Sequence, residues 1–262
     1  SRVIMDAPPD KEDCRPFVQV AGLMAQAGLN APQVLAWEEP QGFMLLSDLG
    51  QRTLMQCLDE GAGAANLPRF KQALDVLLPW QRASRANVLP AYDEAVLRRE
   101  LALFPDWYLS QHRGVRLNES QQAVLQTAFD AIVQRNLAAP QVYVHRDYHS
   151  RNLMVLDKGN PGILDFQDAV YGPITYDLVS LLRDAYVQWD EEMVLDWAIR
   201  YWERARKAGL PVSHDVDDFY RDFEFMGLQR HLKVLGIFAR LFHRDGKDGY
   251  LNDMPLVMEY TR

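Results

Sequence analysis

The sequence contains few cysteines, no excess of positive charge and no long hydrophobic run. Cys14 and Cys57 are the only cysteines among 262 residues, which is typical of reduced thiols in the cytosol, although one disulfide is possible. Lys and Arg number 28 against 36 Asp and Glu, and the net charge of −8 disfavours nucleic acid or an anionic membrane as a partner. The best candidate for a membrane span, residues 234–242, is interrupted by Arg240 and is too short. These features favour a globular protein of the cytoplasm.

Residues 1–50 are expected to form a small unit of strands with one helix. Strands are predicted at 3–5, 33–37 and 42–46. The helix between the first two strands is expected to start at an Asp13 cap and to stop at Gly28. Leu49 and Gly50 then act as a hinge to the rest of the chain.

The remainder, residues 51–262, is dominated by helical periodicity. Helices are predicted at 53–59, 67–85, 92–110, 118–136, 174–188, 191–208 and 215–243. A strand at 141–144 and a hairpin of strands 153–156 and 162–164 interrupt them. The buried stripe of helix 118–136 is expected to consist of Ala123, Leu125, Ala128, Ala131, Ile132 and Leu137. The predicted fold class is α+β, with a small strand lobe and a large helical lobe.

The most informative segment lies between the two predicted strand regions of the helical part. Residues 145–152 read HRDYHSRN and match the pattern H-R-D-x-x-x-x-N of a phosphoryl-transfer loop. Such chemistry requires a carboxylate that orients the acceptor hydroxyl and takes its proton, a role that suits Asp147. The alternative is that the polar residues only cap turns, but the strand context makes this the less favoured interpretation.

A second acidic position follows the predicted hairpin. Asp165 closes the segment Ile163-Leu164-Asp165-Phe166, and the hairpin brings this turn back toward Asn152. One amide oxygen and one carboxylate are hard oxygen ligands, which Mg²⁺ prefers when it binds a nucleotide triphosphate. The sequence therefore predicts a Mg²⁺ site at Asn152 and Asp165.

A nucleotide site is predicted where the third strand runs into the hinge. Leu46 supplies an apolar surface, and the backbone of Ser47 and Leu49 supplies an acceptor and a donor. Adenine requires this combination of a flat apolar surface and paired backbone groups. By itself the segment is also compatible with an ordinary turn after a strand.

The acceptor is expected to be small. Protein kinases seat a peptide on a long segment that ends in Ala-Pro-Glu, which this sequence lacks. Here only residues 168–171 separate the Asp165 turn from Gly172-Pro173 and the next helix. His149 also stands where protein kinases usually carry lysine.

With these motifs the sequence resembles the aminoglycoside phosphotransferase and choline kinase superfamily, which has a bilobal protein-kinase-like fold. The runs VHRDYHSRNLM, ILDFQDAVYGPITYDLVSLLRD and FMGLQRHLKVLGIFARL are similar to bacterial anomeric kinases of N-acetylmuramate and N-acetylglucosamine. The resemblance implies ATP-dependent phosphorylation of the C1 hydroxyl of an amino sugar, in cell-wall recycling. It also implies Asp147 as the catalytic base, Asn152 and Asp165 as Mg²⁺ ligands, and adenine held at Ser47 and Leu49.

The sequence departs from that family at its beginning. No lysine occurs at 3–6, and Phe17 or Gln19 stands where a helical glutamate is expected. No G-x-G-x-x-G phosphate loop is present. The simplest account is that upstream strands, which would carry these groups, are missing.

The sugar site is less defined by the sequence. His149 and Arg151 lie within the catalytic loop, and Asp168 could face the metal or the sugar. Arg183 and Arg230 are candidates because arginine is well suited to the lactyl carboxylate of a muramate. For residues on helices, a solvated surface is the competing interpretation.

Two alternatives remain open from the sequence. The protein could be another kinase of the superfamily, acting on an aminoglycoside, choline or a homoserine-like alcohol. It could also be an inactive module that binds nucleotide or sugar, as the missing lysine and phosphate loop would favour. The preferred amino sugar, the reacting anomer and the oligomeric state are not determined.

Overall fold

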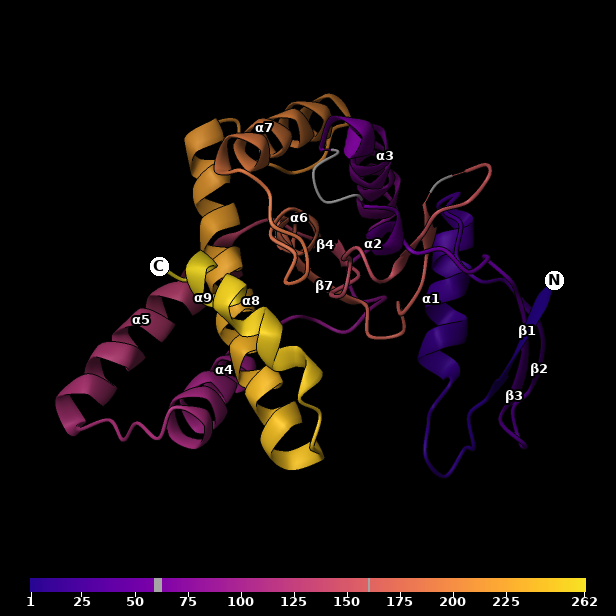
Figure 1. The fold of residues 1–262 in the computed structure, drawn as a ribbon. Helices are drawn as coiled ribbons and strands as arrows, with labels where there is room; N and C mark the ends of the chain where they lie inside the picture. The colour runs from indigo at the N-terminus through magenta and orange to yellow at the C-terminus, as the bar shows by residue number, and fades with distance from the viewer. Residues whose placement is uncertain (59–62, 160) are drawn as a thin grey trace.

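The computed structural model describes residues 1–58, 63–159 and 161–262 (Figure 1). The predicted helix end at Asp59 and the hairpin residue Asn160 lie outside the described residues. The structure mixes helices and strands, which confirms the α+β class. Within the described ranges, no helix combines the length and the apolar character needed to cross a membrane. Cys14 and Cys57 are free thiols.

The first part of the chain is a three-stranded antiparallel sheet with one helix beside it (Figure 1). The strand order is β1-β3-β2, formed by β1 (Arg2–Asp6), β2 (Val34–Glu38) and β3 (Phe43–Ser47). Cys14 occupies the N-cap position of helix α1 (Arg15–Gln26) without a capping hydrogen bond from its side chain, so the N-cap expected at Asp13 was wrong by one residue. Asp13 instead accepts the backbone N–H of Arg15 at 3.0 Å. Gly28 ends the helix in a left-handed conformation, with φ +75°, as predicted.

Helices make up most of the chain after the hinge. They are α2 (Leu54–Cys57), α3 (Gly63–Arg82), α4 (Glu94–Leu103), the π-helix η1 (Phe104–His112), α5 (Glu119–Ala138), α6 (Tyr176–Leu182), α7 (Glu191–Lys207), α8 (Val216–Asp245), the 3₁₀ helix η2 (Gly249–Asp253) and α9 (Met254–Tyr260). The predicted helix 92–110 is thus α4 continued by a π-helix. The predicted helix 174–188 ends at Leu182, and the last helix, α9, was not predicted.

Two short strand pairs hold the loops that carry the motifs. Strand β4 (Gln141–Val144) pairs with β7 (Val170–Pro173), and β5 (Leu153–Met154) pairs with β6 (Gly162–Ile163). Both pairs are antiparallel. The hairpin of β5 and β6 was predicted, whereas β7 was not. The residues between β4 and β5, and those between β6 and β7, therefore form two neighbouring turns.

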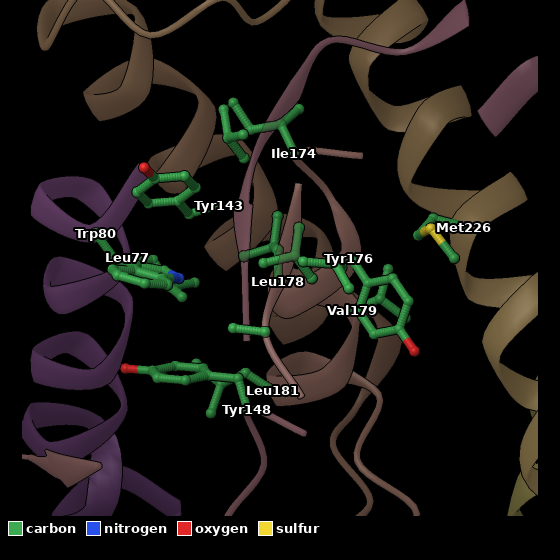
Figure 2. Packing of buried hydrophobic residues seen from close by; sticks show 14 of the residues in the cluster. Leu77, Trp80, Tyr143, Tyr148, Ile174, Tyr176, Leu178, Val179, Leu181 and Met226 are labelled. Atoms are coloured by element: carbon green, nitrogen blue, oxygen red, sulfur yellow. The ribbon is translucent and has the colours of Figure 1, made fainter. Parts of the chain in front are cut away.

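Helix α6 lies at the centre of the hydrophobic core. All seven of its residues are buried. Figure 2 shows Leu178, Val179 and Leu181 of α6 between Trp80 of α3 and Met226 of α8. Burial of each such apolar side chain contributes roughly 1.5–3 kcal/mol. The core therefore fixes the start of α6 relative to the strands that carry the motif loops.

Helix α5 buries a different stripe from the one predicted. Ala123, Ala128, Ala131 and Leu137 are exposed and Leu125 is only partly buried, so of the predicted residues only Ile132 is buried. The buried residues of α5 are Phe129, Ile132, Val133 and Asn136. The C-terminal half of the helix alone thus faces the core, because its buried residues all lie there.

Helix α8 crosses very close to the junction of α4 and η1. A side-chain carbon on Gly236 would overlap the backbone of Leu103. Only glycine allows two backbones to approach this closely. This contact brings the polar residues of α8, among them Arg230 and Lys233, against the interior.

Candidate active site

The loop that carries Asp147 is anchored by the start of α6. Asp177 accepts the backbone N–H of His145 at 2.7 Å and that of Arg146 at 3.0 Å. The His145 ring is fully buried, with Nε2 2.9 Å from the carbonyl oxygen of Leu164, and its Nδ1 accepts the backbone N–H of Asp147 at 3.2 Å. His145 and Asp177 thus brace both motif turns.

His145 is uncharged at neutral pH. Burial lowers the pKa of its ring to about 4, against the raising effect of the Asp147 charge. A neutral ring is what the two contacts require, because Nδ1 accepts a hydrogen bond while Nε2 donates one. Burial also raises the pKa of Asp177 to about 7, although the two backbone donors act in the opposite direction.

We expect His145 to make the protein sensitive to mild acid. Its pKa of about 4 in the folded state lies below its usual value in the unfolded chain. The unfolded state therefore takes up the proton first as the pH falls, and stability decreases. Between about pH 7.5 and about pH 5 the free energy of unfolding should fall by roughly 2 kcal/mol through this residue.

Urea unfolding of His145→Gln at both pH values tests this expectation. The fall should be smaller in the variant by that amount, whereas His214→Gln, at an exposed position, should behave like the unmodified protein. An identical pH dependence in His145→Gln and the unmodified protein would contradict the assignment.

The two motif turns meet at Asn152. The backbone N–H of Leu164 donates to the carbonyl of Asn152 at 2.9 Å. The side-chain Nδ2 of Asn152 donates to the carbonyl of Asp147 at 3.0 Å and to Oδ2 of Asp165 at 3.2 Å. This orientation leaves Oδ1 of Asn152 as the side-chain atom that can ligate a cation. The structure thus brings Asp147, Asn152 and Asp165 together.

The donor set fits Mg²⁺. Mg²⁺ is usually held by one or two protein oxygen ligands together with phosphate oxygens and water. Oδ1 of Asn152 and the Asp165 carboxylate are such a pair. Within the residues that the structure covers, no group of three or more His, Cys, Asp or Glu side chains could hold a metal.

Asp165 adopts an unusual backbone conformation that the following residue helps to hold. Its φ is +60°, in the left-handed region, where aspartate is tolerated better than most residues. Phe166 is fully buried and packs on Phe17 of α1, with ring centroids 4.7 Å apart. Phe17 therefore connects α1 to the turn that carries Asp165 by an apolar contact.

Lys233 and Arg230 place positive charge near Asp147, and two imidazoles also act on it. Burial would raise the pKa of this carboxyl, but Lys233, His145, His149 and Arg230 outweigh it and lower the pKa. Asp147 is therefore a carboxylate at neutral pH, able to accept a proton. Lys233 and Arg230 both come from α8, one turn apart.

His149 and Arg151 meet a common aromatic side chain. The His149 ring lies edge-on to Tyr186, with centroids 5.5 Å apart, and Cζ of Arg151 lies 3.5 Å from the Tyr186 centroid. Burial lowers the pKa of His149 and raises that of Tyr186 to about 12. The electrostatic effects on His149 include those of Asp147 and Asp165, so this aromatic group adjoins the motif turns.

The two helical arginines of the predicted sugar site have different surroundings. Arg183 forms ion pairs with Glu191 and Glu224 through its Nη2, each at 2.7 Å, while its buried Nε has no hydrogen-bond partner among the described residues. Arg230 is only 4% exposed, and its Nη1 has no hydrogen-bond partner among the described residues. The structure thus gives Arg183 an ion-pairing role and leaves Arg230 with a donor to satisfy. The backbone carbonyl of Asp168 accepts from Nη1 of Arg146 at 3.5 Å.

The predicted nucleotide segment lies close to the strand that leads to Asp165. Leu46 is buried, and the Ser47 N–H is already used, because it donates to the carbonyl of Gln33 at 3.0 Å. The Leu49 side chain adjoins Gly162 of β6, where an added carbon would lie 3.0 Å from it. The hinge therefore packs on the strand that leads to Asp165.

Sequence reasoning missed two buried acids. Glu100 of α4 pairs with Arg146 at 2.6 Å and with Lys233 at 3.1 Å. Asp184, after α6, accepts the backbone N–H of Ser150 at 2.9 Å. Each acid stands among apolar residues of a predicted helix, Glu100 in 92–110 and Asp184 in 174–188, and this signal could have marked both as internal partners.

Comparison with known protein families agrees with this arrangement. The model of the phosphotransferase enzyme family matches residues 1–210. The chain belongs to this family. It is accordingly an ATP-dependent kinase.

Individual relatives extend the similarity over nearly the whole chain. It is 54% identical over 260 residues to an N-acetylmuramate/N-acetylglucosamine kinase of Pseudomonas aeruginosa, covering 99% of this chain and 76% of that protein. It is 51% identical over 263 residues to the kinase of the same name from Neisseria meningitidis, covering 100% and 78%. Among solved structures, ADP-bound aminoglycoside phosphotransferase APH(2'')-Ib has a TM-score of 0.59 at 15% identity, covering 100% and 86%. At that identity only the fold is shared.

Proposed function

We propose that this kinase phosphorylates the C1 hydroxyl of N-acetylmuramate and N-acetylglucosamine. The observation that carries the proposal is the similarity along nearly the full chain, at 54% and 51% identity, to kinases named for these two sugars. Phosphorylation at C1 would feed nucleotide-sugar synthesis from recycled cell-wall sugars. Because ATP is the donor, we place the reaction in the cytoplasm.

In this proposal Asp147 takes the proton of the C1 hydroxyl. The ring oxygen makes this hydroxyl more acidic than the others of the sugar, so a carboxylate suffices as the base. Asn152 and Asp165 would hold Mg²⁺, which neutralises phosphate charge when bound. We assign adenine to the surface of Leu46, the carbonyl of Ser47 and the N–H of Leu49.

The charges around Asp147 favour a neutral or anionic acceptor. Lys233, His149 and Arg230 all act on Asp147 as positive or protonatable groups. A cationic acceptor such as choline or an aminoglycoside would be repelled by Lys233 and Arg230, and would need carboxylates in their place. An N-acetylated sugar has no such conflict.

We propose that Arg230 binds the lactyl carboxylate of N-acetylmuramate, with His149, Arg151 and Asp168 around the sugar. The buried Nη1 of Arg230 needs an acceptor, and a carboxylate on the substrate would supply one. N-acetylglucosamine lacks the lactyl group that carries this carboxylate and has a free hydroxyl in its place, while the rest of the sugar is the same. The two substrates therefore isolate the contribution of Arg230. Arg183 is left out of the site because Glu191 and Glu224 occupy it.

Arg230→Gln should change the preference between the two sugars. We expect kcat/KM for N-acetylmuramate to fall about 10- to 100-fold, since a charge-assisted hydrogen bond is lost, with N-acetylglucosamine changed less than about threefold. Arg200→Gln, at an exposed ion pair of α7, is the control and should leave both values unchanged. An equal fall in kcat/KM for both sugars would show that Arg230 does not bind the carboxylate.

The function itself is tested by ADP release with a panel of acceptors. The panel contains both sugars, the methyl glycoside of N-acetylglucosamine, an aminoglycoside, choline and homoserine. Both free sugars should react, whereas the methyl glycoside should not, because its C1 oxygen is blocked. Phosphorus NMR of the product should show an anomeric phosphate. Reaction of the methyl glycoside would move the acceptor to another hydroxyl, and no reaction with any acceptor would favour an inactive binding module.

A further inference from the structure

The catalytic loop contains a strained residue that needs support from outside the loop. Arg146, directly before Asp147, has φ +77°, in the left-handed region. For a residue other than glycine this conformation is unfavourable and persists only where neighbours hold it. Two hydrogen bonds from α6 support it. Asp177 accepts the Arg146 N–H at 3.0 Å, and the Ser180 hydroxyl donates to the Arg146 carbonyl at 3.4 Å.

The third supporting contact is an ion pair between the Arg146 side chain and α4. Nη2 of Arg146 lies 2.6 Å from Oε1 of Glu100, a residue that is only 5% exposed. The same oxygen lies 3.1 Å from Nζ of Lys233, and the other carboxylate oxygen accepts from the Tyr92 hydroxyl. Both oxygens of Glu100 are therefore engaged, and one carboxylate faces two cations, the buried Lys233 and the partly exposed Arg146. Such a carboxylate cannot be neutralised without leaving those cations unpaired.

In protein kinases the ordering of the active loops is often controlled by pairing of arginine with a phosphorylated residue of the activation segment. Here residues 166–169 alone separate Asp165 from β7, and β7 is paired with β4. The anion that meets Arg146 comes instead from helix α4. It is a permanent part of the folded chain rather than an added group.

We propose that Glu100 is a positioning residue that holds Arg146, and through it Asp147, in the geometry needed for phosphoryl transfer. Its carboxylate supplies internally the charge that a phosphorylated side chain supplies elsewhere. Activity should therefore not depend on phosphorylation of the enzyme. Glu100 acts through Arg146 and does not touch the substrates.

The test compares Glu100→Gln, Arg146→Gln and the double variant. Each single change should lower kcat about 10- to 100-fold, because a small displacement of a catalytic group has effects of this size, while KM for ATP and sugar changes less than about threefold. The double variant should be no slower than the slower single variant. Multiplied effects in the double variant, or a folded Glu100→Gln with unchanged kcat, would overturn the proposal.

Two features keep this test decisive. If Glu100→Gln does not fold because two cations are left unpaired, Arg146→Gln still removes the contact while Glu100 and Lys233 remain paired. Glu94→Gln, on the same helix and in an exposed ion pair with Arg98, is the matched control and should keep the original kcat. Phosphatase treatment should not change kcat of the unmodified enzyme, and a loss would also count against the proposal.

Hydrogen exchange gives a readout that does not depend on the acceptor. Peptides from residues 145–152 should exchange faster in either single variant, with α6 as protected as before. This measurement tests the role of Glu100 even if neither amino sugar is a substrate. Lack of activity with both sugars would reject the proposed function and would not by itself reject the role of Glu100. Unchanged exchange in 145–152 would show that Glu100 does not hold the loop.

Discussion

Asp147→Asn should lower kcat by about a thousandfold while leaving nucleotide binding nearly unchanged. The substitution keeps the size of the side chain but replaces the carboxylate that we propose as the acceptor of the sugar proton with a neutral amide. Asp147 is well placed for this role because the neighbouring cations keep its pKa low despite burial, so that it is ionised at working pH. Steady-state ADP release with N-acetylglucosamine measures the effect.

Binding and folding must be separated from chemistry in this variant. Thermal stabilisation by ADP with Mg²⁺ should match that of the unmodified enzyme, because Asn152 and Asp165 are unchanged. Asp157→Asn, at an exposed position of the hairpin turn, serves as the control for loss of a nearby charge. Turnover by Asp147→Asn within about tenfold of normal would exclude Asp147 as the general base.

Asp165→Asn is expected to have the second largest effect, a fall in kcat of roughly 10²–10³-fold. Asparagine tolerates the φ of +60° at this position, and its single amide oxygen can still accept from Gln167. What is lost is the negative charge that would hold Mg²⁺, together with the oxygen that accepts from Nδ2 of Asn152. The Mg²⁺ concentration needed for half-maximal rate should therefore rise.

Titration of the rate with Mg²⁺ distinguishes this role from a structural one. Asp157→Asn should give the same Mg²⁺ dependence as the unmodified enzyme. For Asp165→Asn, part of the lost rate should return at high Mg²⁺, whereas a structural defect would give a low rate at every concentration. A normal rate with a normal Mg²⁺ dependence would remove Asp165 from the proposed metal site.

The contact between Phe17 and Phe166 joins helix α1 to the turn that carries Asp165. The family pattern expects a glutamate on this helix, and the chain has Phe17 in contact with the loop instead. An apolar contact does not depend on ionic partners or on pH. Within the described residues, α1 is therefore connected to the Asp165 loop by packing of aromatic rings.

Several tertiary features could not be predicted from local sequence. Strand β7 exists because residues 170–173 pair with β4, about thirty positions earlier, and a four-residue strand has too little pattern of its own. The predicted stripe of α5 was wrong for Ala123, Ala128, Ala131 and Leu137, which are exposed although they lie at helical spacing, whereas Ile132 is buried and Leu125 packs partly buried on the core. Whether a helix face is covered depends on its neighbours and not on its own periodicity.

In the candidate site, too, some residues could be predicted from the local sequence and others could not. Asp147, Asn152 and Asp165 are recognisable because phosphoryl transfer needs these residue types, and a short hairpin between them limits where their turns can lie. Arg183 and Arg230, by contrast, looked equivalent in the sequence. The ion pairs of Arg183 and the unpartnered Nη1 of Arg230 appear only when other helices have packed around them.

By itself the sequence determined the α+β class, the motif turns and the chemistry that they suit, because each depends on residues close together in the chain. Only the tertiary structure decided which charges meet in the interior. Glu100, Arg146 and Lys233 come from three distant segments, and their contact follows from the packing of α4 and α8 around the catalytic loop. Buried charges select their partners by proximity in space, a property that local sequence does not contain.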